Sequence, residues 1–350
     1  MNKELEKFKE YIISENPGKI GIVMHHTPDP DSMGAALGVL KLINTWNEEA
    51  KCSILYDGEI SHSQNKTMVN VLGINMTKVS DVDEGVDNLF DCYVTVDATP
   101  ERCPIPKDVN VIMTIDHHRV DSAIPKIKDI RAVGSTSSII WEYLSEENIV
   151  LDKNNESDAI VATALLMGIK TDTSDLVSEN VTDLDFEAYK SLMGSVNRRN
   201  LSSIINYPIP PYHFEIRSKL DQKENTKEDN GVFVGGVGYL SNTKRDALAM
   251  MADERSKVEG IETAFVFAIV GENIDVSVRS VGLSVDVNAL CQKIFGKQYA
   301  GGKMGAGGAK IPLGFLSIDY EMDESIKEKV WESVKSIMIH KIFHVMSGNV

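Results

Sequence analysis

Apolar and polar positions alternate along the first half of the chain in a way that predicts strands separated by helices. In residues 2–15, for example, Leu5, Phe8 and Ile12 recur at helical spacing, and the short apolar run "KIGIVM" follows. The predicted strands are 19–24, 52–56, 92–97 and 109–116, and the predicted helices are 2–15, 31–46, 135–144 and 157–172. Strands that alternate with helices predict an α/β domain, a parallel sheet with helices on both faces.

The pattern changes after residue 182. Residues 183–213 are helical and then broken by the prolines of "YPIPPYHF", which mark a connector. Beyond it, two pairs of β-rich runs predict hairpins, 214–220 with 232–240 and 263–270 with 273–282. A glycine-rich stretch, "YAGGKMGAGGAKIPLG", precedes a last strand and a final helix near 323–342. We therefore predict three parts: an α/β domain (1–182), a helical connector (183–213) and a smaller α+β domain (214–350).

Composition narrows the class of protein. The 350 residues suffice for two domains with cores, and the net charge of −16 argues against binding of long duplex nucleic acid, which needs a broad basic face. A small anionic ligand in a local pocket stays compatible with that charge. The four cysteines form no C-x-x-C pair, as a zinc ribbon would need, and are typical of reduced thiols. The N-terminus lacks the apolar core of a signal peptide, and no uncharged apolar stretch reaches membrane-spanning length. We expect a cytoplasmic protein without a membrane partner.

Acidic and imidazole residues follow four of the apolar runs. A single Asp or His after a strand is an ordinary turn or structural residue. Here, however, the carboxyl ends of parallel strands meet at one edge of a sheet, so the whole set should converge there. The set comprises His25, His26, Asp29 and Asp31 of "HHTPDPDSMG", Asp97 of "VDATP", Asp116, His117 and His118 of "IDHHRV", and Asp172 of "MGIKTDTSD".

Such crowding predicts bound cations. Like charges held close together raise one another's pKa unless something cationic lies among them. Two divalent ions would supply a charge of +4 against the −4 of Asp29, Asp31, Asp97 and Asp172. Carboxylate and imidazole without thiolate favour Mn²⁺, with Mg²⁺, Co²⁺ and Zn²⁺ as alternatives.

These four motifs, in this order and each after an apolar run, resemble those of the DHH phosphoesterase family. "VSVRSVG" and the glycine-rich stretch resemble the associated C-terminal substrate domain of that family, in its branch of oligoribonucleases and 3′-phosphoadenosine 5′-phosphate phosphatases. The resemblance implies a two-metal site in residues 1–182. It places His25, Asp29 and Asp172 at one Mn²⁺, Asp31 and His117 at the other, and Asp97 between the two ions.

The resemblance also implies roles beside the ions. Asp116 would orient the neighbouring imidazole, and His118 would hydrogen-bond the substrate phosphate. His26 falls at a position that the family does not use as a ligand. A stretch resembling a Ser-His-x-x-Asn segment of some members places His62 and Asn65 either in the cleft or at a capped surface helix.

In the C-terminal domain, Arg279 and Ser280 resemble the family's phosphate-gripping pair, and Gly301 and Gly302 would let the backbone approach the ligand. The family's Gly-Gly-Gly-His run is replaced here by Gly301, Gly302, Lys303 and Met304, so Lys303 would supply a point charge in place of an imidazole. The stretch 271–312 carries five basic and three acidic residues in an otherwise acidic chain. The replacement of the family's Gly-His by Lys303 and Met304 affects the expected substrate contacts and leaves the expected metal site unchanged.

The implied activity is two-metal hydrolysis of short single-stranded oligonucleotides or small nucleotides, including dinucleotides, cyclic dinucleotides and 3′-phosphoadenosine 5′-phosphate. A pyrophosphatase or exopolyphosphatase is the first alternative, although the Ser-Arg-Lys tripeptide of the related pyrophosphatases does not occur in this sequence. The second alternative is a nucleotide-binding module that has lost catalysis. The resemblance further implies a homodimer.

Overall fold

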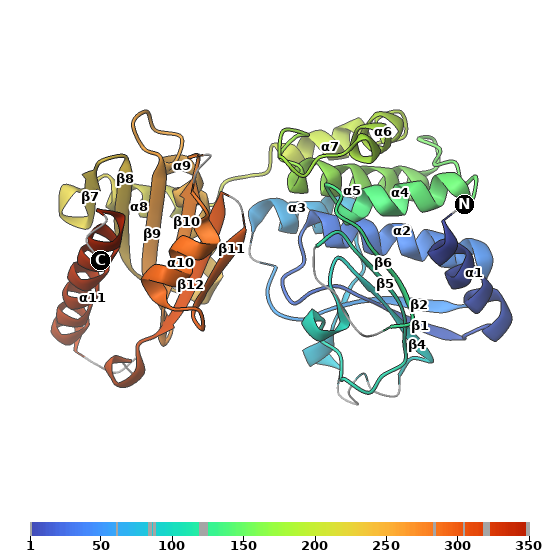
Figure 1. The fold of residues 1–350 in the computed structure, drawn as a ribbon, viewed down its shortest axis with the longest axis horizontal. Helices are drawn as coiled ribbons and strands as arrows, with labels where there is room; N and C mark the ends of the chain where they lie inside the picture. The colour runs from blue at the N-terminus through green and yellow to red at the C-terminus, as the bar shows by residue number, and fades with distance from the viewer. Residues whose placement is uncertain are drawn as a thin grey trace. The chain divides into compact units, whose positions relative to one another are not determined.

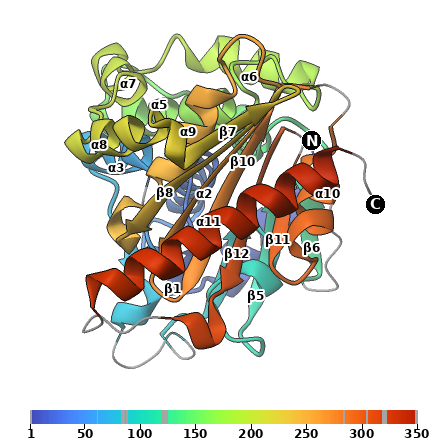
Figure 2. The same cartoon turned by 90° about the vertical axis from the view of Figure 1, so that its left-hand side faces the viewer.

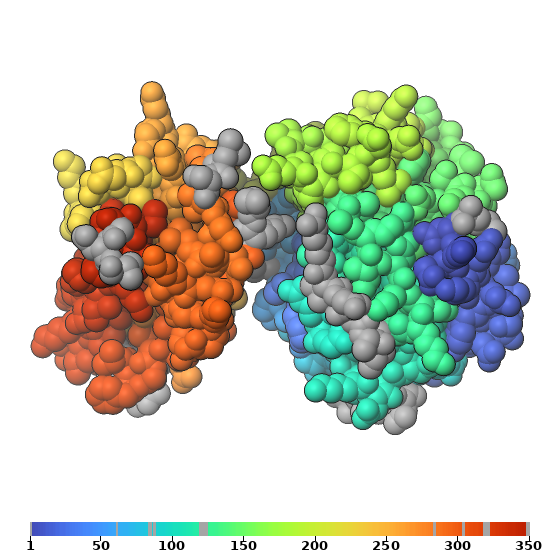
Figure 3. All heavy atoms as spheres, in the orientation of Figure 1, coloured from blue at the N-terminus to red at the C-terminus, as the bar shows by residue number. Residues whose placement is uncertain are grey.

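The computed structural model describes residues 2–60, 62–82, 86, 89–118, 125–282, 285–303, 305–317 and 323–347. It forms two compact units, Met1–Pro208 and Ile209–Val350, called here the first and the second unit (Figures 1 and 3, blue to yellow-green and yellow to red). Their division falls inside the expected connector, because α6 (Asp183–Leu192) and α7 (Arg198–Ile205) belong to the first unit and α8 (Pro211–Leu220) to the second. The domain boundaries at 182 and 214 stay a prediction.

The first unit contains the predicted parallel sheet, which confirms the α/β fold class. All of its pairings are parallel, and the strand order is β3-β2-β1-β4-β5-β6. All six strands therefore end at the same edge. The strands are β1 (Lys19–Val23), β2 (Lys51–Tyr56), β3 (Thr77–Lys78), β4 (Cys92–Val96), β5 (Val111–Asp116) and β6 (Ile127–Ile130).

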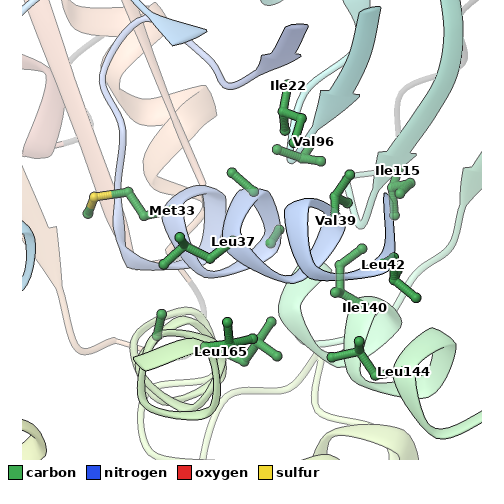
Figure 4. Close-up of a cluster of buried hydrophobic side chains, with 14 of the residues drawn as sticks. Ile22, Met33, Leu37, Val39, Leu42, Val96, Ile115, Ile140, Leu144 and Leu165 are labelled. Atoms are coloured by element: carbon green, nitrogen blue, oxygen red, sulfur yellow. The ribbon is translucent and has the colours of Figure 1, made fainter. Parts of the chain in front are cut away.

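One face of this sheet packs against helices, with α2 (Pro30–Trp46) next to the strands. Figure 4 shows α2 between sheet residues such as Ile22 and Val96 and the helices α4 (Thr136–Glu146) and α5 (Glu156–Asp172). A Cβ added at Gly38 would lie 2.3 Å from Ile140 Cγ2, so glycine permits the close contact of α2 with α4. The helix α1 (Lys3–Glu15) adds Leu5, Phe8 and Ile12 to the same core, and α3 (Ser63–Leu72) adds Met68 and Leu72.

The other face of the first sheet corrects our expectation of helices on both sides. Its small core of Val23, Leu55 and Tyr93 is covered by Ala98 and Cys103, which belong to the connection from β4 to β5. In the described residues this connection forms only the 3-10 turn Pro100–Arg102. Three prolines within residues 100–106 exclude an α-helix there, because proline lacks the N–H donor and clashes with the preceding turn.

The second unit is the predicted smaller α+β domain. Its sheet has the order β11-β12-β10-β9-β8-β7 and is antiparallel except for β8 with β9. Helices α8 and α9 (Ala247–Arg255) pack on one face, and α10 (Val287–Phe295) and α11 (Glu324–Met346) on the other; Figure 2 shows α11 crossing in front of the strands. The strands are β7 (Thr226–Asp229), β8 (Val232–Leu240), β9 (Thr263–Val270), β10 (Asn273–Ser280), β11 (Ala300–Lys303) and β12 (Ala306–Pro312).

Two expectations for this unit were wrong in detail. Residues 214–220 lie in α8 rather than in a strand, because His213, Ile216 and Leu220 are buried at helical spacing. The strand that pairs with β8 is instead β7, joined by Asn230 and Gly231, both with positive φ as a tight hairpin turn requires. The glycine-rich stretch itself forms β11 and β12, and the strand expected after it falls partly on residues 318–322, outside the described residues. Among the helices of the described chain, none combines the length and the apolar character needed to cross a membrane.

Candidate metal centre

The candidate site lies at the point where the strand order of the first sheet reverses. From the adjacent strands β1 and β4, the chain proceeds outward to β2 and β3 on one side and to β5 and β6 on the other. Ligands of open α/β sheets bind beyond the strand ends at such a point. His25 lies just after β1, Asp97 directly follows β4, and His117 directly follows β5.

Two groups of ligand-type side chains meet there, and the carboxylate of Asp97 connects them. His25 Nε2 lies 3.7 Å from Asp29 Oδ2 and 3.6 Å from Asp97 Oδ2. His117 Nε2 lies 3.5 Å from Asp97 Oδ1, so the two oxygens of Asp97 face different histidines. The ligand atoms of His25, Asp29 and Asp97 lie within 4.8 Å of one another, as do those of Asp31, His117 and Asp172, and Asp97 and His117 form a further set of this kind with His118. The predicted convergence of the motifs is therefore present.

Asp172 belongs to a different group from the one that the resemblance implied. Its Oδ2 lies 3.2 Å from His117 Nε2, whose distance to Asp31 Oδ2 is 3.9 Å. The first group is thus His25, Asp29 and Asp97, and Asp172 joins Asp31 and His117. The last turn of α5 carries Asp172 to this place. We call the six residues of both groups, His25, Asp29, Asp31, Asp97, His117 and Asp172, the metal centre.

The pair Asp116 and His118 also differs from expectation. Asp116 Oδ1 lies 2.7 Å from Nδ1 of His118 and accepts the backbone N–H of the same residue at 3.0 Å, so it orients His118 rather than His117. The ring of His117 is positioned instead by the carbonyl oxygen of Val133, 3.1 Å from its Nδ1. His118 is half-exposed and its Nδ1 lies 3.8 Å from Asp97 Oδ1, at the rim of the centre.

The N-terminus of α4 holds two of the carboxylates. The backbone N–H groups of Thr136 and Ser137 donate to Asp31 Oδ2 and Oδ1 at 2.7 and 2.8 Å, and Thr136 Oγ1 donates to Asp97 Oδ1 at 2.9 Å. Helix N-termini stabilise negative charge through their unpaired N–H groups and the helix dipole. Sequence reasoning predicted this helix but missed its role. The available signal was the serine- and threonine-rich start of the helix, which also suits ordinary capping.

A fully buried carboxylate braces this helix start. Asp185, from α6, accepts the Gly134 N–H at 2.9 Å, the Ser138 hydroxyl at 2.5 Å and the Thr182 N–H at 2.8 Å. These bonds satisfy its charge without a cation. Asp185 therefore fixes the segment that holds Asp31, and nothing in the sequence distinguished it from an ordinary helix-start acid.

Glycine allows α2, α4 and α5 to meet at Asp31. A Cβ added at Gly168 would lie 2.3 Å from Ser137 Oγ and 2.7 Å from Asp31 Oδ1, and one at Gly34 would lie 2.6 Å from the Ala164 carbonyl oxygen. Contacts this short require atoms to move. The residues of the metal centre are therefore held by helices α2, α4 and α5, which pack so closely that a side chain at Gly34 or Gly168 would clash.

The electrostatics of the centre fit a pair of cations. Burial, and then the neighbouring carboxylates, raise the pKa of Asp31, and burial is also the main cause of the raised pKa of Asp97. Asp172 ends α5, where the helix dipole disfavours an acid. Within the described chain, His117 Nε2 is buried without a well-aligned hydrogen bond. The donor set of carboxylates and imidazoles without thiolate therefore fits two divalent ions, with Mn²⁺ favoured.

Mn²⁺ binding should release protons. Burial alone would lower the pKa of His25 and His117, but the adjacent carboxylates outweigh it and raise each pKa to about 10. Both imidazoles are therefore protonated at neutral pH without metal, whereas a metal ligand must be neutral. The apparent Mn²⁺ affinity should rise with pH up to about 10, because fewer protons then need displacing. Titration calorimetry at pH 7 in buffers of different ionisation enthalpy should show about one to two protons released; heats independent of the buffer would contradict this.

In the second unit, the structure separates the two residues expected to act as a pair. Arg279 and Ser280 are consecutive in β10, so their side chains point to opposite faces. Ser280 is buried, and its hydroxyl lies 3.0 Å from Thr263 Oγ1 and donates to the Glu262 carbonyl. Arg279 is half-buried on the face that α9 covers. Gly301 and Gly302 lie in β11, whereas the side chain of Lys303 and the whole of residue 304 lie outside the described structure.

The remaining candidates lie beside the metal centre without joining it. His26 is mostly exposed, with its Nδ1 3.8 Å from Asp57 Oδ2. His62 caps α3 by accepting the Gln64 N–H, and its ring contacts that of Tyr207. Asn65 donates to the Pro28 carbonyl at 3.1 Å, so it fixes the loop that carries Asp29.

A parallel sheet whose reversal point brings together two histidine–carboxylate groups around one shared aspartate defines a protein built to hold a pair of divalent cations. Residues 19–169 match the model described as the DHH family, N-terminal domain. This part of the chain is a DHH-family domain.

Among its relatives, the uncharacterized protein MJ1633 of Methanocaldococcus jannaschii is 34% identical over 340 residues, which are 97% of this chain and 66% of that protein. A probable manganese-dependent inorganic pyrophosphatase of Streptococcus thermophilus is 30% identical over 162 residues, 44% of this chain and 48% of that protein. The chain thus spans about half to two thirds of the length of these relatives. The crystal structure of an exopolyphosphatase-related protein from Bacteroides fragilis shares the fold, with a TM-score of 0.70, 16% identity, and coverage of 97% of this chain and 99% of that one.

Proposed function

We propose that the protein is a metal-dependent phosphoesterase that hydrolyses short oligonucleotides or small nucleotides. The observation that carries the proposal is the shared position of Asp97, whose two oxygens face one histidine of each group at 3.6 and 3.5 Å. A carboxylate placed in this way suits two ions held side by side, the arrangement that serves in-line displacement at phosphorus. The match of residues 19–169 to the DHH family and a relative named as a probable manganese-dependent inorganic pyrophosphatase support the same chemistry.

Bound divalent ions supply activation of water and neutralisation of charge on the phosphoryl oxygens. The protein's own contribution is to place groups around them. The residues of the metal centre would hold the ions, with Asp31 and Asp97 fixed from behind by the N-terminus of α4. His118 is held through Nδ1 by Asp116, which leaves Nε2 at the rim, where the doubly protonated ring would donate a hydrogen bond to a phosphoryl oxygen of the substrate.

The choice of nucleotides over pyrophosphate rests on the second unit. Residues 271–312 form a locally basic stretch, and the Ser-Arg-Lys tripeptide of the related pyrophosphatases is missing from the sequence. Hydrolysis of pyrophosphate or polyphosphate is the second candidate, favoured by the 30% identity to the Streptococcus thermophilus protein. A catalytically weak nucleotide-binding module is the third candidate.

A substrate panel separates these candidates. The Mn²⁺-loaded chain is incubated with the dinucleotide pApA, a cyclic dinucleotide, 3′-phosphoadenosine 5′-phosphate, pyrophosphate and a short polyphosphate, and the released mononucleotide or phosphate is measured. We expect turnover of a nucleotide. Turnover of pyrophosphate or polyphosphate alone would establish the second candidate, and saturable binding of nucleotides without turnover would establish the third.

A further inference from the structure

Arg279 is held at two points on different sides of its guanidinium group. Its Nε donates to Asp253 Oδ1 at 2.6 Å, and its Nη1 donates to the Val278 carbonyl at 3.0 Å. The carboxylate of Asp253 comes from the last turn of α9, which packs against β10. A charge-assisted bond of this length fixes the plane of the guanidinium group.

The outer edge of the same group stays available. Arginine has five N–H donors in a planar fork, and the contacts of the described residues occupy two of them. The side chain of Arg279 is 24% exposed, so the other donors reach solvent. The outer edge, formed by Nη1 and Nη2, keeps an N–H on each nitrogen, so the fixed guanidinium plane can bind a phosphate there with two parallel hydrogen bonds.

The surface next to Arg279 has little on it to block a ligand. In the neighbouring strand β12, Ala306 lies directly opposite Arg279 and Gly308 lies opposite Ser277, whereas Ala264 of β9, on the other side, is fully buried. Residues directly opposite each other in a sheet share a face, so small residues flank the guanidinium group on the β12 side.

We propose that Asp253 is a positioning residue for substrate binding: it orients Arg279 so that the outer edge of the guanidinium group grips a phosphate of the nucleotide. This inference deepens the proposed function and rests on it for the identity of the ligand. Asp253 itself is 47% exposed, and as a carboxylate it has no donor to offer a phosphate. Its effect passes through the geometry of Arg279.

The competing explanation is that the ion pair only fastens α9 to the sheet. The opposite end of the same helix offers the matched comparison, because Arg245 there pairs with Asp275 at the other end of β10. Both pairs join the α9 segment to β10, but only one involves Arg279. If the ion pairs only fasten α9 to the sheet, breaking Arg279–Asp253 or Arg245–Asp275 should change KM to the same extent.

The test compares D253A, D253E, R279Q and R245Q in the full Mn²⁺-loaded chain with pApA as substrate. We expect KM to rise about thirtyfold in R279Q and about tenfold in D253A, with kcat within about twofold of the wild type, since charged hydrogen bonds at a ligand contribute on this scale. D253E should recover part of the loss, because it restores a carboxylate. R245Q should leave KM unchanged, and thermal melting of each variant checks that it is folded.

Each other result is decisive. A raised KM in R279Q with an unchanged KM in D253A would show that Asp253 does not position Arg279, and an equal rise in R245Q would show fastening alone. If the wild type is active and R279Q has the same KM, the inference is overturned while the proposed function stands. If the wild type turns over none of the panel, equilibrium dialysis of radiolabelled pApA against the same variants in EDTA reads the contact directly. Loss of binding in D253A then supports the inference, and the absence of saturable binding by the wild type overturns it.

Discussion

The variant D97N should lose Mn²⁺-dependent turnover by about 10³-fold or more, because a single carboxylate serves both halves of the metal centre. Its oxygens lie 3.6 Å from His25 Nε2 and 3.5 Å from His117 Nε2, so the amide removes charge from both ion positions at once. Asparagine is the suitable replacement, since Asp97 has a φ of 57° and asparagine tolerates that left-handed conformation. Initial rates over a range of Mn²⁺ concentrations measure the effect.

The same variant should keep its fold. Without metal, D97N removes one of four crowded carboxylates, so its melting temperature should equal or exceed that of the metal-free wild type. Mn²⁺ should raise the melting temperature of the wild type far more than that of D97N. D175N is the matched control, an Asp with a φ of 62° in the same motif as Asp172 that is largely exposed. Turnover of D97N at the rate of D175N would end the two-metal proposal.

The variant G168A should be destabilised by about 3 kcal/mol, which corresponds to a fall in Tm of roughly 6–12 °C. The added methyl would lie 2.3 Å from Ser137 Oγ and 2.8 Å from Asp31 Cα, and the second of these atoms belongs to the backbone of α2. Relief therefore requires α2 and α5 to separate, which displaces Asp31 from the N-terminus of α4. Mn²⁺ affinity should fall together with stability, and calorimetry with thermal melting measures both.

Gly194 provides the control for that substitution. A Cβ there would meet only the Ser191 carbonyl oxygen, at an ordinary contact distance of 3.5 Å, and Gly194 does not have a positive φ. G194A should shift Tm by no more than about 2 °C. If G168A has the same Tm and the same Mn²⁺ affinity as G194A, the close packing at Asp31 does not stabilise the metal centre.

The metal centre was largely predictable because each ligand follows an apolar run, and parallel strands deliver their ends to one edge. What the sequence could not show is side-chain direction. The assignment of Asp172 to the group of His117, and of Asp116 to His118 rather than His117, depends on where rings and carboxylates turn after the strand has ended. In the same way, the alternation of a strand sends Ser280 away from Arg279, although the two are adjacent in sequence.

The supporting groups were missed for another reason. Thr136 and Asp185 carry ordinary helix-start signals, and their importance arises only from the distant segments that they meet. Residues 214–220 were assigned to a strand because a short apolar run fits either period, and tertiary packing against the second sheet decided for the helix. Local pattern therefore predicted the elements better than the contacts between them.

The reversal of strand order between β1 and β4 has a consequence for how this protein can change during evolution. The connections from these two strands leave in opposite directions across the sheet, so either can lengthen or shorten without disturbing the hydrogen-bonded ladder between them. In the proposed function, the residues at the strand ends would set the reaction chemistry, and segments further along the chain would contact the leaving group. Substrate preference could then diverge among descendants of one ancestral fold while the metal centre stays in place.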